Sequence, residues 1–173
     1  MKKRLYIITV CLVSIILLAT CQAESQPADA SVPLADVTVS GWHIVVEDAM
    51  VRQSMQNVTV DLGYTDVQTN EYVKTAPAGK QFCLVKLYIE KAGSREKIEW
   101  DNMRLTDAAG REYCRTDDNF IAEMGMKRMP GTPLNFGASE GWIAFEIDED
   151  AEGLVLLYPF EEADFTYALE VSK

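Results

Sequence analysis

Three methionines stand within six residues of one another, at Met124, Met126 and Met129. Thioether sulfur is a soft ligand that suits Cu(I), so this spacing is compatible with a copper-handling site. Methionine side chains are also flexible and fill irregular gaps in hydrophobic cores. We favour core packing, because the chain offers only one histidine, His43, to complete such a site, and metal handling is the alternative.

A second set of candidate ligands lies in the acidic segment 147–153, which carries Asp148, Asp150 and Glu152. Carboxylate oxygens are the ligands that Ca²⁺ prefers, but the residue spacing of an EF-hand loop is absent. Acidic residues at the tip of a β-hairpin normally face solvent. We therefore expect a solvated turn here, with a calcium site as the alternative.

The residues needed for nucleophilic catalysis are scarce. Serine and cysteine nucleophiles depend on histidine as a base, and His43 lies beside Trp42 inside a predicted strand. No Gly-x-Ser-x-Gly motif is present. We predict no catalytic residue and no cofactor. A hydrolase built on two of the 27 acidic residues is an alternative, because sequence does not supply the carboxylate separation such chemistry needs.

The first 20 residues have the organisation of a secretory signal peptide. Lys2, Lys3 and Arg4 form a basic start, and residues 5–19 carry no charge. A membrane-spanning helix needs about 20 apolar residues, so an uncleaved anchor is the less favoured interpretation. Residues 21–36 are rich in alanine, serine, proline and acid, and they cannot bury enough apolar surface to order. We predict a signal peptide over 1–20 and a flexible tether over 21–36.

The tetrapeptide Leu18-Ala19-Thr20-Cys21 resembles the lipobox of bacterial lipoproteins. The resemblance implies that Cys21 is diacylglycerated and becomes the new N-terminus. Thr20 departs from the pattern, which prefers Gly, Ala or Ser, and ordinary cleavage after Ala23 is the alternative. Two acyl chains hold a protein on a bilayer where a single chain is marginal. The predicted location is the outer face of the bacterial cytoplasmic membrane, with the lipid on Cys21 as the anchor.

Two further thiols lie in the predicted domain. Cys11 is in the apolar part of the signal and Cys21 is the lipidation candidate, which leaves Cys83 and Cys114. An exported protein experiences conditions that permit disulfides. A bridge between Cys83 and Cys114 is one expectation, and two buried free thiols are the other.

The charge of the chain restricts its partners. Removal of residues 1–20 takes away three basic residues and no acids, so 13 basic and 27 acidic residues remain and the formal charge becomes −14. Nucleic acid binding depends on Lys and Arg neutralising phosphates, so we expect no nucleic acid partner. The expected partner is an unidentified protein or envelope polymer, bound in a non-catalytic role.

Short alternating segments separated by turn residues run through the rest of the chain. Trp42, Ile44 and Val46 share one side of a predicted strand, and segment 81–91 alternates in the same way. The segment 107–110 reads as a turn between two strands, with Gly110 free to adopt positive φ. We predict an all-β domain over 37–173, an immunoglobulin-like antiparallel β-sandwich of seven to nine strands.

The order of several motifs resembles a known family. These are Gly79-x-x-Phe82, Leu105-x-Asp107-x-x-Gly110-x-x-Tyr113, Pro130-Gly131 and Gly141-x-x-x-Phe145-x-Ile147. Together, over about residues 79–160, they resemble a telokin-like, immunoglobulin-like domain of unknown function found on bacterial surface lipoproteins, especially Gram-positive ones. The chain has Glu90-Lys91 where an asparagine often follows the long strand. The resemblance implies an extracytoplasmic β-sandwich and no particular activity.

Overall fold

A computed structural model of the protein describes residues 33–62 and 66–172. The predicted signal peptide, Cys21 and most of the predicted tether lie outside the described residues. Ten strands, one α-helical turn and one 3₁₀ turn are present in the described part. In chain order they are β1 Ala35–Val39, β2 Trp42–Arg52, β3 Ser54–Leu62, β4 Val67–Thr75, β5 Lys80–Lys91, η1 Trp100–Asn102, β6 Arg104–Thr106, β7 Glu112–Cys114, α1 Phe120–Glu123, β8 Ala138–Asp148, β9 Val155–Tyr158 and β10 Phe165–Ala168.

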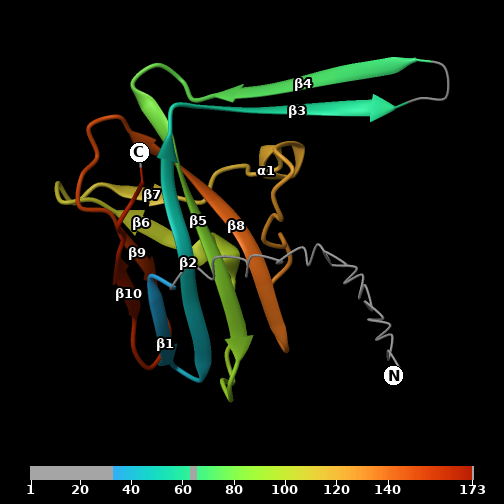
Figure 1. The fold of residues 1–173 in the computed structure, drawn as a ribbon. Helices are drawn as coiled ribbons and strands as arrows, with labels where there is room; N and C mark the ends of the chain where they lie inside the picture. Colours follow the sequence, from blue (N-terminus) through green and yellow to red (C-terminus); the bar gives the residue numbers. More distant parts are fainter. Residues whose placement is uncertain (1–32, 63–65, 173) are drawn as a thin grey trace, which may run out of the picture. The chain divides into compact units, whose positions relative to one another are not determined.

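Two four-stranded antiparallel sheets form a sandwich (Figure 1). The first sheet has the order β1-β2-β5-β8, and the second has the order β10-β9-β6-β7. The remaining strands, β3 and β4, pair only with each other among the described residues. The sandwich therefore has eight strands, within the predicted seven to nine, and the prediction of an all-β antiparallel sandwich is confirmed.

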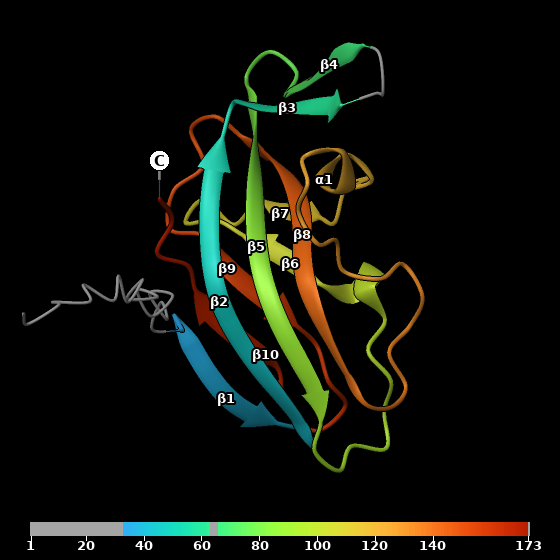
Figure 2. The same cartoon turned by 45° about the vertical axis from the view of Figure 1, so that its right-hand side comes forward.

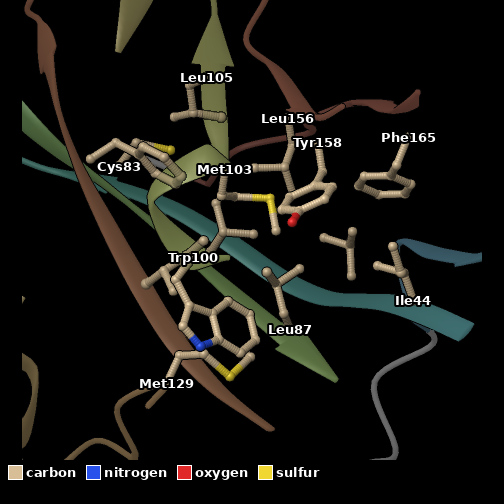
Figure 3. Close-up of a cluster of buried hydrophobic side chains, with 14 of the residues drawn as sticks. Ile44, Cys83, Leu87, Trp100, Met103, Leu105, Met129, Leu156, Tyr158 and Phe165 are labelled. Atoms are coloured by element: carbon tan, nitrogen blue, oxygen red, sulfur yellow. The ribbon is translucent and has the colours of Figure 1, made fainter. Parts of the chain in front are cut away.

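The core lies between the two sheets and follows the alternation of the strands (Figure 3). On β5, the side chains of Cys83, Val85, Leu87 and Ile89 all point inward and are buried, because successive strand residues face opposite sides. The second sheet contributes apolar side chains from each of its strands, including Leu105, Tyr113, Leu156 and Phe165. All three tryptophans are buried, Trp42 and Trp100 in this core and Trp142 on the other face of β8.

A smaller apolar cluster lies on the other face of β5 and β8. Phe82 and Leu84 of β5 and Trp142 of β8 pack there against Phe120 and Ile121 of α1. This cluster explains why β5 and β8 are apolar on both faces. It also explains why the segment 117–128, which contains α1, folds back on the sheet.

The strands β3 and β4 form a hairpin that leaves the end of the first sheet (Figures 1 and 2). The chain passes from β2 through Gln53 into β3, and returns through Ala76 towards β5. We call residues 54–75 the arm. Only the base of the arm packs on the rest of the domain, through partly buried Met55 and Tyr72.

Candidate functional site

The structure separates the methionines that the sequence placed together. Met129 is fully buried in the main core, where Figure 3 shows it among other apolar side chains. Met124 and Met126 pack instead against the outer cluster on the opposite face of the sheet. Copper handling would need these sulfur atoms to converge, and they lie in different clusters. The positions agree with the favoured interpretation of core packing.

The carboxylates at the end of β8 form hydrogen bonds and ion pairs with basic side chains of the same chain. Asp148 accepts a hydrogen bond from Lys80 Nζ at 2.6 Å, and its other oxygen lies 3.1 Å from the Arg111 guanidinium. Asp150 accepts from the same guanidinium at 2.8 Å, while Glu152 is exposed. No group of three or more His, Cys, Asp or Glu side chains is placed to hold a metal ion within residues 33–62 and 66–172.

Asp107 is the centre of a hydrogen-bonded turn. Its side chain is inaccessible to solvent and accepts hydrogen bonds from the main-chain N–H groups of Ala109 and Arg111, at 3.0 and 2.9 Å. The Arg111 guanidinium donates to it at 2.6 Å and the Tyr113 hydroxyl at 2.9 Å. The motif Leu105-x-Asp107-x-x-Gly110-x-x-Tyr113 thus encodes an exposed turn between β6 and β7 that is held by the buried Asp107 side chain.

The pKa values in this turn follow from the same contacts. Burial alone would raise the pKa of Asp107, but the hydrogen bonds from Arg111 and Tyr113 outweigh it and hold that pKa below its usual range. Burial, with the neighbouring Asp107 and Asp148 carboxylates, raises the pKa of Tyr113 to about 12. A carboxylate kept ionised and a phenol kept protonated are suited to structure, because neither can exchange a proton near neutral pH.

A second charged cluster fixes the loop that contains α1. Asp118 is 2% exposed and accepts hydrogen bonds from Arg115 Nε at 2.7 Å and Arg128 Nε at 2.5 Å. The Arg115 guanidinium also donates to the carbonyl oxygens of Met129 and Pro130. These hydrogen bonds join residues 115, 118, 128, 129 and 130, so the cluster clamps the loop.

The remaining residues singled out by the sequence do not assemble a catalytic site. His43 lies on the solvent-facing side of β2, and its Nε2 is 2.7 Å from Asp36 Oδ1. Cys83 is buried in the core and Cys114 is exposed, and both are free thiols, so the bridge considered from the sequence is absent. Burial raises the pKa of the Cys83 thiol to about 12, which keeps it protonated and unreactive.

Surface hollows among the described residues include two of about 500 Å³ or more, which is enough for a small ligand. One, of about 610 Å³, is lined by residues that include Arg95, Glu96 and Glu161. The other, of about 500 Å³, lies between the edge strands β1 and β10. Neither lining contains histidine or cysteine, so neither hollow supplies an imidazole base or a thiol nucleophile.

The arm presents an apolar face to solvent. Val58, Val60 and Leu62 of β3 are 51, 58 and 76% exposed, and Val73 of β4 is 52% exposed. Because strand residues alternate between faces, the three β3 side chains lie on the same side of the hairpin as Val73. We call these four residues the apolar stripe. Soluble proteins rarely leave a row of adjacent apolar side chains uncovered unless it serves an interaction.

The opposite face of the arm carries Met55 and Tyr72 at its base, and polar side chains there also anchor the hairpin. Asn57 Nδ2 donates a hydrogen bond to the carbonyl oxygen of Glu123 in α1, at 2.7 Å. Lys74 Nζ lies 5.4 Å from the centre of the Phe120 ring. These contacts hold the base of the arm with the apolar stripe turned away from α1.

The arm is the candidate functional site of the described residues, and it was not predicted from the sequence. The one signal available was the alternation of Val58, Val60 and Leu62, which normally marks a face packed on a core. The sequence does not show whether a second layer of structure covers that face. The site became visible only when the strand pairing placed β3 and β4 outside both sheets.

Comparisons with known proteins add little beyond this geometry. No family model matches the chain, and no curated protein matches it. An uncharacterized β-sandwich protein from Clostridium difficile 630 is 9% identical, with 81% of this chain and 93% of that chain covered, at a TM-score of 0.44. A secreted protein from Mycobacterium tuberculosis, MPT63, is 14% identical, with 80% and 95% covered, at a TM-score of 0.42. Among the described residues, no helix has the length and apolar character needed to cross a membrane.

Proposed function

We propose that this protein is an exported lipoprotein that binds another protein through its arm. The observation that carries the proposal is the apolar stripe of Val58, Val60, Leu62 and Val73, exposed on a hairpin that pairs with no other strand of the described chain. A binding role is non-catalytic, in keeping with the separation of the methionines and the internal pairing of the charged clusters. The stripe is apolar and therefore suits a protein surface better than a polyhydroxylated envelope polymer.

The anchoring part of the proposal rests on the sequence. A basic start, an uncharged apolar segment and the lipobox-like Leu18-Ala19-Thr20-Cys21 support export and lipidation of Cys21. The motifs over residues 79–160 support a telokin-like domain of the kind found on surface lipoproteins. In this proposal the lipid holds the chain at the outer face of the cytoplasmic membrane, and segment 21–36 connects it to the sandwich.

Anchoring and binding are tested separately. Mass spectrometry of the mature protein should find a lipid-modified Cys21 as the first residue, and an unmodified Glu24 in that place would overturn the anchoring. For binding, a photo-crosslinking amino acid is placed in intact cells at Leu62, on the apolar stripe, or at Gln68, on the opposite face of the arm. We expect a crosslink to one identified exported protein from Leu62 and none from Gln68. Equal crosslinking from both positions, or from neither, would contradict binding through the stripe.

A further inference from the structure

Within the described residues, the outer edges of the arm carry main-chain groups that no other strand pairs with. The Ala76 N–H donates to the Gln53 carbonyl at 2.9 Å, which makes this opposing pair a hydrogen-bonded one. In an antiparallel ladder, hydrogen-bonded and non-hydrogen-bonded pairs alternate. Counting along the ladder from Gln53 and Ala76, every second opposing pair is hydrogen-bonded. The pairs Val58↔Glu71 and Val60↔Thr69 are therefore non-hydrogen-bonded pairs. Their N–H and C=O groups therefore point outward, away from the partner strand.

The free edge of β3 and the apolar stripe belong to the same residues. Val58, Val60 and Leu62 each direct a side chain to the exposed face and their main-chain groups to the outer edge. A strand added along this edge would lie about 4.8 Å from β3. Every second side chain of that strand would then rest beside the stripe. One added segment thus satisfies the main chain and covers apolar surface together.

The β3 edge lacks the features that normally prevent strand addition. Proteins protect exposed edges with proline, lysine, bulges or very short strands. The nine residues of β3 contain neither proline nor lysine, and their pairing with β4 runs without a register shift. A two-stranded hairpin is also marginally stable by itself, so a third strand would stabilise the arm.

Charge and area indicate what kind of segment is added. The charged groups of β3 and β4 away from the base of the arm are acidic: Glu71 lies on the face of the apolar stripe and Asp61 on the opposite face. Lys74 is at the base of the arm near the Phe120 ring. A second copy would bring the same acidic arm and a whole chain of net charge −11, or −14 without residues 1–20. The stripe itself offers on the order of 300 Å² per copy. Two stripes packed together would bury about 600 Å², which is below what a stable dimer needs.

We propose that the outer edge of β3 binds an extended, lysine- or arginine-rich segment of a partner protein, which adds to the arm as a third strand. The inference rests on the proposed function and specifies how the arm binds. Main-chain pairing supplies affinity, the apolar stripe selects alternating apolar side chains, and the acidic surroundings select positive charge.

The first test uses synthetic probes and the full chain purified in mild detergent. The probe is a blocked nonapeptide of alternating lysine and valine, compared with a glutamate–valine peptide and with a lysine–valine peptide N-methylated at every second residue. By fluorescence anisotropy we expect only the unmethylated lysine–valine peptide to bind. Hydrogen–deuterium exchange should slow in residues 54–62 more than in residues 67–75. No binding, or equal binding of the N-methylated peptide, would overturn strand addition.

The second test distinguishes the two edges of the arm. Val60 and Thr69 oppose each other, and both direct their N–H groups outward. Val60→Pro removes one donor from the β3 edge, and Thr69→Pro removes the equivalent donor from the β4 edge, without breaking the ladder between them. We expect Val60→Pro to weaken peptide binding by about tenfold and Thr69→Pro by less than about twofold. Val60→Thr keeps the N–H and should weaken binding by about threefold, through loss of apolar contact alone.

The outcomes also separate this inference from the function on which it rests. If the peptides fail but Leu62 still crosslinks to its partner in cells, the arm binds by another mode and strand addition is wrong. If crosslinking from Leu62 fails as well, the binding function falls with it. A dimer in sedimentation that Val58→Thr with Val60→Thr dissociates would assign the edge to a second copy and overturn the foreign partner.

Discussion

At the scale of single residues, close packing explains the glycine that begins the motif Gly141-x-x-x-Phe145-x-Ile147. Gly141 lies in β8 at the point where segment 127–129 crosses it, and the Lys127 carbonyl accepts a hydrogen bond from the Trp142 N–H at 2.8 Å. A Cβ at position 141 would lie 2.7 Å from the main-chain nitrogen of Met129. The atoms in the way are backbone, so they cannot rotate aside as a side chain could.

Gly141→Ala should therefore destabilise the protein by about 2–3 kcal/mol, because the crossing segment must shift to admit the methyl group. The matched control is Gly131→Ala, where a Cβ would meet only the end of the Arg128 side chain, at 3.6 Å. That change should alter the free energy of unfolding by less than about 0.5 kcal/mol. Urea denaturation of both variants measures the difference. Equal effects would show that segment 127–129 does not restrict position 141.

At the scale of elements, the sequence predicted those strands whose alternation has one buried face. The inward positions of β2, at Trp42, Ile44 and Val46, were predicted correctly and are fully buried. The same reasoning could not describe α1, which has four residues, follows the buried Asp118, and is held by contacts with β3, β5 and β8 from far along the chain. It could not anticipate the arm either, since the alternation of Val58, Val60 and Leu62 does not reveal whether anything covers that face.

The turn between β6 and β7 gives a prediction about pH. The Tyr113 hydroxyl donates to Asp107 at 2.9 Å, and burial beside two carboxylates raises the pKa of Tyr113 from 10.0 to about 12. A group whose pKa is raised on folding stabilises the protein fully below its unfolded pKa and loses that contribution as pH rises towards the folded value. The contribution of Tyr113 should thus be complete below about pH 10 and disappear towards pH 12.

Tyr113→Phe is the matched variant, because it removes only the hydroxyl. The variant should be less stable than the parent at pH 8, where it lacks the hydrogen bond to Asp107. The gap should narrow between about pH 10 and pH 12, since only the parent loses stability by ionising Tyr113. Urea unfolding at several pH values measures the gap, and the lysines that titrate in the same range are common to both proteins. A gap that stays constant to pH 12 would show that Tyr113 has no raised pKa.

At the scale of the described molecule, stability and binding occupy different parts of the chain. The main core draws its residues from the two sheets and the loops between them, and none comes from β3 or β4. From residue 58 to residue 71, towards the tip of the arm, every described side chain is exposed. The arm buries little apolar surface, so it gains almost no hydrophobic stabilisation to offset the conformational entropy lost when its residues are ordered. Its contribution to folding therefore does not explain why it is present. Because the arm contributes no residue to the main core, we assign binding of the partner protein to it.

The division predicts that the tip of the arm can be removed without loss of the fold. Asn57 and Tyr72 oppose each other as a hydrogen-bonded pair, so an Asn-Gly turn can replace residues 58–71 between them. This truncation keeps the contact of Asn57 with Glu123, and the free energy of unfolding should change by less than about 0.5 kcal/mol. A longer truncation, with Asn-Gly in place of residues 56–73, also removes Asn57 and Tyr72 and should cost about 1–2 kcal/mol. Both proteins should unfold in one cooperative transition in urea, while binding of the lysine–valine peptide is lost. Loss of cooperative unfolding in the shorter truncation would mean that the tip stabilises the sandwich. The exposed tip would then no longer indicate a binding partner.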